Sequence, residues 1–161
     1  MKFKNEISAG GIVFKKVKDK KGKENIFWLI CQHSQHKGWI FPKGLIGDKN
    51  SNESMKEAAL REVEEEGGVK AKIIDDYPVK VEYMYQWRNS PHGGKDGERM
   101  LVKKTVYYYL MEYLTGDPKN HDWEVSEAKF LPENEVMNML TYKSDRQAFD
   151  KILKKFKKNV V

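Results

Sequence analysis

The chain has 161 residues, of which 39% are hydrophobic and 34% charged, and we predict one folded domain over residues 1–161. Its net charge of +6 favours anionic ligands such as nucleotides, RNA ends or inositol phosphates. Its one cysteine, Cys31, excludes an intramolecular disulfide and is typical of a reducing, cytoplasmic setting. No apolar run approaches roughly 18 residues and the N-terminus lacks the apolar centre of a signal peptide, so we expect no membrane partner. No feature of the sequence points to an obligatory protein partner.

The first half of the chain predicts extended segments that lead into one helix. Gly10 and Gly11 interrupt the first segment and predict a close backbone contact there. The second segment is nearly all apolar at its start, which is typical of a strand buried on both faces. The predicted extended segments are residues 7–17, 26–33 and 39–44.

The second half predicts further strands followed by two helices. Pro78 separates the first two strands, and residues 88–98 contain one proline and three glycines, so we expect a mobile surface loop there. The predicted strands are residues 69–77, 79–87, 99–114 and 124–131. The predicted helices are residues 133–140 and 143–156. These elements together predict a domain of the α+β class.

A helix over residues 55–66 is predicted from its two ends. Ser54 is followed three residues later by Glu57, which is the pattern of a capping box. The pair Gly67 and Gly68 supplies residues that adopt the left-handed conformation of a helix end at little cost.

Three glutamates share one face of this predicted helix. Glu62, Glu65 and Glu66 stand at positions i, i+3 and i+4, so their negative charges repel one another unless a cation lies among them. Hard oxygen ligands at this density suit Mg²⁺, Mn²⁺ or Ca²⁺, and Mg²⁺ typically takes one or two carboxylates together with substrate phosphates. The competing interpretation is a solvated acidic stripe.

The stretch from residue 47 to residue 69 resembles the Nudix box of the Nudix hydrolases. That box reads Gly, five residues, Glu, seven residues, and then Arg-Glu-aliphatic-any-Glu-Glu-any-Gly-aliphatic. The residues that satisfy it are Gly47, Glu53, Arg61, Glu62, Val63, Glu65, Glu66, Gly68 and Val69. The resemblance implies the Nudix fold, in which a mixed β-sheet is sandwiched between helices.

The loop before the box allows two alignments. Family members often carry Pro-Lys-Gly with that glycine opening the box, and here Gly44 of this motif lies nine residues before Glu53. Either Gly44 is the equivalent residue and the loop is three residues longer, or Gly47 is. The backbone carbonyl implied to bind metal then belongs to Lys43 by one alignment and to Ile46 by the other.

The resemblance also implies roles for the box residues and for a general base outside it. Glu62 and Glu66 would be the primary Mg²⁺ ligands, Glu65 a ligand directly or through water, and Arg61 would orient a carboxylate such as Glu53. The candidates for the general base are Glu124, Glu127 and, within the box, Glu65. The alternative for Glu124 and Glu127 is that both are exposed residues of an edge strand.

Three further segments resemble the branch that hydrolyses dinucleoside polyphosphates asymmetrically: residues 39–44, 104–110 and 140–146. Phosphate contacts are predicted for Lys43, Lys103 and Lys104, and base contacts for Tyr107 and Tyr109, which share a strand face opposite Tyr108. A core role is the alternative for each tyrosine.

We therefore expect a metal-dependent pyrophosphohydrolase that cleaves a nucleoside diphosphate linked to another moiety, with diadenosine tetraphosphate as the model substrate. Removal of pyrophosphate from RNA 5′ ends and cleavage of diphosphoinositol polyphosphates are alternative activities that the basic charge also permits. The remaining alternative is a Nudix module that binds nucleotide or RNA without catalysis, and the retention of all three glutamates argues against it.

Overall fold

The computed structural model describes residues 2–47, 52–89 and 98–160. Within them, eight strands form one sheet with the central order β3-β2-β1-β7-β5, while β4 pairs with β1, β6 with β7 and β8 with β2. The strands are β1 (Lys2–Lys18), β2 (Glu24–His33), β3 (Trp39–Ile40), β4 (Lys43–Leu45), β5 (Val69–Ile73), β6 (Val79–Asn89), β7 (Glu98–Gly116) and β8 (Val125–Pro132). The helices are α1 (Met55–Gly67), α2 (Glu133–Met139), α3 (Lys143–Asn159) and the short 3₁₀ helix η1 (Pro118–Asn120).

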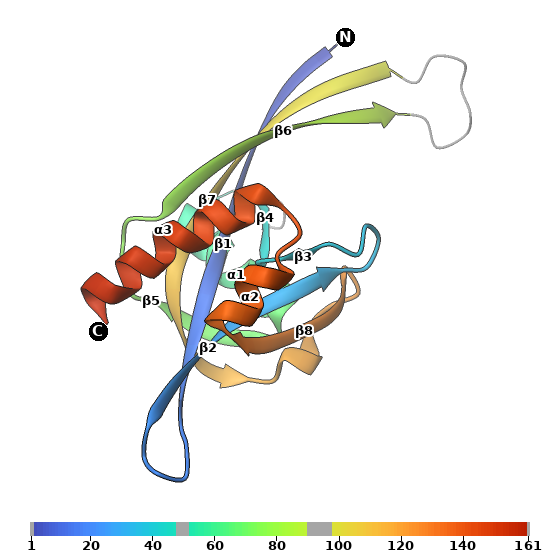
Figure 1. Cartoon of the computed structure of the whole chain (residues 1–161). Helices are drawn as coiled ribbons and strands as arrows, with labels where there is room; N and C mark the ends of the chain where they lie inside the picture. The colour runs from blue at the N-terminus through green and yellow to red at the C-terminus, as the bar shows by residue number, and fades with distance from the viewer. Residues whose placement is uncertain (1, 48–51, 90–97, 161) are drawn as a thin grey trace.

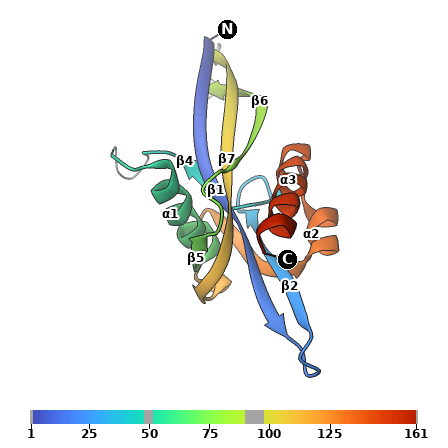
Figure 2. The ribbon, with the colours of Figure 1, turned by 90° about the vertical axis from the view of Figure 1, so that its left-hand side faces the viewer.

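The helices lie on the two sides of the sheet, with α1 on one side and α2 and α3 on the other (Figure 2). Each side has its own core. Val63 of α1 packs in one apolar cluster with Tyr109 and Met111 of β7. Phe149 of α3 packs in the other with Trp28 of β2, their ring centroids 5.2 Å apart in an edge-to-face arrangement. The predicted mixed sheet between helices, of class α+β, is confirmed.

Strand β1 is longer than the sequence predicted. It begins at Lys2, because residues 2–6 run parallel to residues 100–104 of β7 and pair with them. The predicted loop at residues 88–98 is also shorter, since its first two residues end β6 and its last begins β7. Residues 90–97 lie outside the described part of the chain, so the expected mobility there stays a prediction.

Three strands continue beyond the layer of helices and form what we call the arm. The arm consists of residues 2–8 of β1, 83–89 of β6 and 98–104 of β7, with β7 in the middle. Figure 1 shows these strands projecting past the N-terminal end of α3, and Figure 2 shows them without a helix on either side.

Candidate active site

Helix α1 begins and ends where the sequence predicts. The Ser54 side chain accepts a hydrogen bond from the backbone N–H of Glu57, whose own side chain accepts one from the backbone N–H of Ser54. Gly68 ends the helix with φ of 73°, in the left-handed region that glycine adopts most readily. The helix therefore holds the face that carries Glu62 and Glu66 in one orientation against the sheet, where these residues are 4% and 5% exposed.

Arg61 organises the carboxylates at the exposed side of this face. Its Nε donates to Glu53 Oε2 at 2.6 Å and its Nη2 to Glu53 Oε1 at 3.0 Å, which makes a bidentate pair. Its Nη1 donates to Glu62 at 2.8 Å and to Glu65 at 3.0 Å. The carboxylate of Glu53 also accepts a hydrogen bond from the backbone N–H of Gly47, at 3.3 Å. One guanidinium thus links three carboxylates that would otherwise repel one another.

Strand β4 brings backbone groups against the buried glutamates. The backbone N–H of Lys43 donates to Glu66 Oε1 at 3.2 Å. The carboxylate of Glu62 lies against Gly44 in the space that a Cβ atom would take. This close approach requires glycine at position 44, whereas Gly47 lies at φ of 78° and contacts Glu53 instead. The geometry places the Lys43–Gly44 pair, rather than Ile46 and Gly47, beside the two buried carboxylates.

The buried pair is electrostatically unusual. Burial raises the pKa of Glu66 to about 8, and the negative charge of Glu62 adds to that effect. Burial likewise raises the pKa of Glu62 to about 7, although Arg61 opposes the rise. The hydrogen bonds from Arg61 hold the pKa of Glu53 below its ordinary value. Two buried carboxyls that ionise with difficulty are stabilised as carboxylates by a cation placed between them.

The donor set fits a hard divalent cation. Glu62, Glu65 and Glu66 offer carboxylate oxygens on one helix face, and a cation bound there would relieve the cost of ionising the two buried groups. Over the described ranges, no three His, Cys, Asp or Glu side chains converge at ligating distances. Arg61 instead holds the Glu62 and Glu65 carboxylates.

Of the two predicted bases outside the box, the structure brings one to the site. Glu124 lies near enough that its negative charge contributes to raising the pKa of both Glu62 and Glu66. The segment just before Glu124 is fixed to the end of α1, because the backbone N–H of Asp122 donates a hydrogen bond of 2.7 Å to the Glu65 carbonyl. Glu127 is exposed on β8 and pairs with Lys129 at 3.2 Å, away from this site.

The predicted lysine contacts separate onto the two faces of the sheet. Lys43 and Lys104 lie together on the α3 side, where burial and the charge of Lys43 both lower the pKa of Lys104. Burial alone would lower the pKa of Lys43, but Asp145 and Glu66 raise it above its ordinary value. Lys103 points to the opposite face, where it pairs with Glu82 at 3.4 Å.

The predicted tyrosine contacts lie on the α1 side. Tyr109 is 4% exposed and packs in the core with Val63. Tyr107 is half-buried two residues earlier on the same strand face. Neither shares a face with Lys43 and Lys104, and their role as substrate contacts stays a prediction.

Sequence reasoning did not single out Tyr83 and Asp145, which complete the group around these lysines. Tyr83 of β6 pairs with Lys104 of β7, and Asp145 of α3 accepts a hydrogen bond of 3.0 Å from the Tyr108 hydroxyl. We call Lys43, Lys104, Tyr83 and Asp145 the lysine cluster. Asp145 lies within residues 140–146, a segment whose resemblance to the family could have pointed to it, whereas no sequence pattern marks Tyr83.

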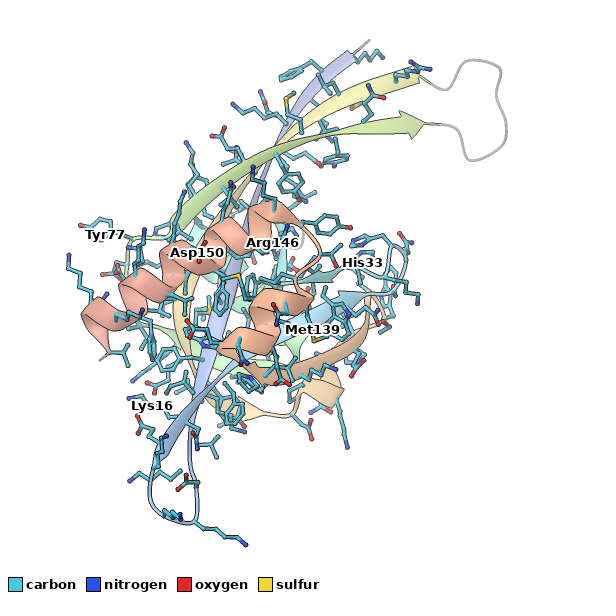
Figure 3. All side chains as sticks on the ribbon, in the orientation of Figure 1. Lys16, His33, Tyr77, Met139, Arg146 and Asp150 are labelled. Atoms are coloured by element: carbon cyan, nitrogen blue, oxygen red, sulfur yellow. The ribbon has the colours of Figure 1, made fainter. Side chains whose placement is uncertain are left out.

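Two histidines border the lysine cluster. The rings of His33 and His36 stack with centroids 4.1 Å apart, and His36 Nδ1 lies 3.0 Å from the Tyr142 hydroxyl. Burial and the nearby charge of Lys43 lower the pKa of His33. In Figure 3, His33 lies near the N-terminal end of α3, where Arg146 is labelled.

Comparison with known proteins identifies the family. The model of the NUDIX domain matches residues 8–155. The chain is a member of the Nudix family. It is therefore a Nudix hydrolase, of a family that generally depends on divalent metals, and the chemistry of such enzymes is the hydrolysis of a phosphoanhydride.

Individual relatives agree with this assignment. The chain is 30% identical over 149 residues to MutT4 of Mycobacterium tuberculosis, covering 91% of the chain but only 54% of MutT4. It is 30% identical over 137 residues to the RNA pyrophosphohydrolase of Nitratiruptor sp., covering 82% of each protein. A solved structure of the Ap4A hydrolase of C. elegans matches with a TM-score of 0.60 at 20% identity, over 95% of the chain and 98% of that protein, and this likeness concerns the fold.

None of the helices in the described part of the chain is both long and apolar enough to cross a membrane.

Proposed function

We propose that this Nudix hydrolase cleaves dinucleoside polyphosphates asymmetrically with Mg²⁺, in the cytoplasm. The observation that supports this best is the lysine cluster. Lys43 connects the two parts of the site, because its backbone N–H binds Glu66 and its side-chain charge acts on Lys104. Two lysines whose charges act on each other and on Glu66 suit a chain of several phosphates, rather than one phosphate, beside the carboxylates.

The residues of α1 prepare the site for hydrolysis. Glu62 and Glu66 would hold the cation, with Glu65 joining directly or through water, and Arg61 positions these carboxylates through its bonds to Glu53, Glu62 and Glu65. When bound, Mg²⁺ would neutralise phosphate oxygens and lower the pKa of a coordinated water.

Glu124 is the residue we assign to proton transfer. Its charge acts on the two buried glutamates, and it follows the segment that Asp122 fixes to α1. Its carboxylate would accept the proton of the attacking water, while Lys43 and Lys104 hold the remaining phosphates. The second base candidate within reach is Glu65, which already lies on the metal face.

Product analysis tests this proposal. Wild-type protein with diadenosine tetraphosphate and Mg²⁺ should give ATP and AMP, and Glu66→Gln should lower kcat about 1,000-fold because one metal-binding charge is lost. Glu64→Gln is the matched control, since Glu64 is exposed on another side of α1 and should leave kcat within about twofold. Two molecules of ADP would contradict asymmetric cleavage while keeping a hydrolase.

RNA 5′-end pyrophosphohydrolysis is the second candidate function. It is supported by the relative of that name, which the chain matches over 82% of both lengths, and by the net charge of +6. Release of pyrophosphate from 5′-triphosphorylated RNA, with no turnover of diadenosine tetraphosphate, would replace the first proposal by this one. Turnover only of diphosphoinositol polyphosphates would replace both, and binding of nucleotide without turnover of any substrate would indicate a non-catalytic module.

A further inference from the structure

A small concavity of about 200 Å³ lies on the arm, next to the lysine cluster along β6 and β7, and no residue of the metal helix lines it. Its walls are Lys4 and Glu6 of β1, Tyr85 of β6, and Met100 and Val102 of β7. Enclosed pockets for whole small-molecule ligands are typically roughly 300–1,000 Å³. The size of this arm pocket therefore suits one flat ring rather than an entire substrate.

The arm pocket lies on the same face of the sheet as the lysine cluster. Tyr85 follows Tyr83 by two residues on β6, and Val102 precedes Lys104 by two residues on β7, so each pair shares a face. Tyr83 pairs with Lys104 and Tyr85 pairs with Val102. At roughly 3.3 Å per strand residue, Met100 lies about 13 Å along β7 from Lys104.

This face changes from core to open surface along β6. Val81 is buried in the core beneath α3. Tyr83 is half-buried, and Tyr85 is 37% exposed on the arm beyond α3. Figure 1 shows the uncovered strands there, and the sticks in Figure 3 show side chains standing on both faces of them. A ligand on the lysine cluster can thus extend along the arm without moving a helix.

The chemistry of the arm pocket suits an uncharged aromatic group. The ring of Tyr85, the thioether of Met100 and the side chain of Val102 offer surfaces for stacking and apolar contact. Glu6 Oε1 accepts a hydrogen bond of 2.5 Å from the Tyr85 hydroxyl, and Glu6 Oε2 lies 3.9 Å from Lys4 Nζ. A carboxylate repels phosphate but has further lone pairs for ribose hydroxyls or an amino group, so the pocket favours a nucleoside.

A buried hydroxyl lies between the two sites. Ser8 is fully buried on the β1 face that also carries Glu6, and within the described residues its Oγ has no hydrogen-bond partner. Gly10 follows Ser8 by two residues on β1, and Lys43 of β4 occupies the space where a Gly10 side chain would be. Buried hydroxyls are nearly always paired, so the Ser8 Oγ offers hydrogen-bonding capacity on the β1 face between Lys43 and Glu6.

We propose that the arm pocket binds the distal nucleoside of the substrate, with its phosphates on the lysine cluster and the cleaved bond at α1. This inference rests on the proposed function. It assigns Tyr85 to base stacking and Glu6 to the ribose or to an amino group. The extended β6–β7 hairpin then contributes to the selection of substrates that carry a nucleoside at both ends.

Binding measured without turnover tests the pocket separately from the reaction. In the Glu66→Gln background with Mg²⁺, titration calorimetry with diadenosine tetraphosphate should show that Tyr85→Ala raises Kd about tenfold, because one base loses its stacking surface. The Kd of inorganic tetraphosphate should stay within about twofold, since that ion has no nucleoside. Tyr85→Phe, which keeps the ring, should retain most of the affinity.

Met84→Ala is the matched control. Met84 is the neighbour of Tyr85 on β6, is 53% exposed and points to the other face of the arm, so its loss should change neither Kd. An unchanged Kd for diadenosine tetraphosphate in Tyr85→Ala would overturn the inference, as would an equal rise for inorganic tetraphosphate or no binding of the dinucleotide at all. Failure of the proposed function would appear elsewhere, as absence of ATP and AMP with wild-type protein.

Discussion

Helix α1 and the arm hold their charged groups in opposite ways. On α1, Glu62 and Glu66 are buried against β4, and Arg61 binds three carboxylates at once. On the outer part of the arm, strands that no helix covers carry charged side chains such as Lys4, which is 56% exposed (Figure 2). Burial makes the α1 charges costly without a cation and therefore effective once one binds. Substitutions at exposed positions of the arm cost little stability. We therefore assign catalysis to α1 and substrate selection to the arm.

The sharpest division within the site is expected between Glu124 and Glu127. Glu124→Gln should lower kcat about 100-fold, because the amide cannot accept a proton from water. Glu127→Gln should leave kcat within about twofold, since Glu127 pairs with Lys129 at the surface. Steady-state rates with Mg²⁺ over a range of roughly pH 5 to 9 measure both, and equal losses would mean that the base lies elsewhere, with Glu65 as the next residue to replace.

The cost of burying charge on α1 should make the free energy of unfolding of the metal-free protein depend on pH. The pKa of Glu66 is about 8 in the folded chain against an ordinary value of 4.5, so the folded state holds the proton more tightly than the unfolded state. The stability due to this group is complete below about pH 4.5 and is lost as pH rises through 8.

Replacement of Glu66 by glutamine removes the loss of stability that ionisation of this group causes. In the presence of a chelator at about pH 9, Glu66→Gln should exceed wild-type protein in free energy of unfolding by up to about 5 kcal/mol, because the rise in pKa from 4.5 to about 8 is worth about 1.4 kcal/mol per unit. Near pH 4.5 the two should be alike, and Glu64→Gln should follow wild type throughout, because Glu64 is exposed. Urea unfolding at both pH values measures the difference. A lower stability of Glu66→Gln at the alkaline pH would contradict the view that its charge is held at a cost.

The smallest of these effects compares adjacent lysines on opposite faces of β7. Lys104→Ala should raise KM for diadenosine tetraphosphate about tenfold with little change in kcat, because it removes one phosphate contact but no metal ligand and no base. Lys103→Ala should leave KM within about twofold, since Lys103 pairs with Glu82 on the other face. Equal rises in KM would show that net charge, rather than the lysine cluster, attracts the substrate.

Elements with local causes were predicted well. The ends of α1 depend on Ser54, Glu57 and Gly68, all within or beside the helix, and the structure has them where the sequence predicts them. Residues 2–6 were missed as a strand because their stabilisation comes from pairing with β7, almost a hundred positions later. The local pattern of a short charged segment carries no sign of that partner.

The residues of the candidate active site also divide into those with local causes and those placed by long-range contacts. The spacing of Glu62, Glu65 and Glu66 is enough to predict that they share one helix face, because an α-helix repeats every 3.6 residues. The sequence could not separate Glu124 from Glu127, since long-range contacts such as those of Asp122 with Glu65 and of Ser34 with Glu124 place this segment beside α1.

By itself, then, the sequence determined the family box, its helix and the face that carries the acidic residues, because each depends on contacts within a few residues. Only the tertiary structure decided that Lys104 rather than Lys103 joins Lys43, that Tyr83 and Asp145 surround them, and that β1, β6 and β7 form an arm. These depend on strand register and on which face a helix covers, and long-range pairing determines both.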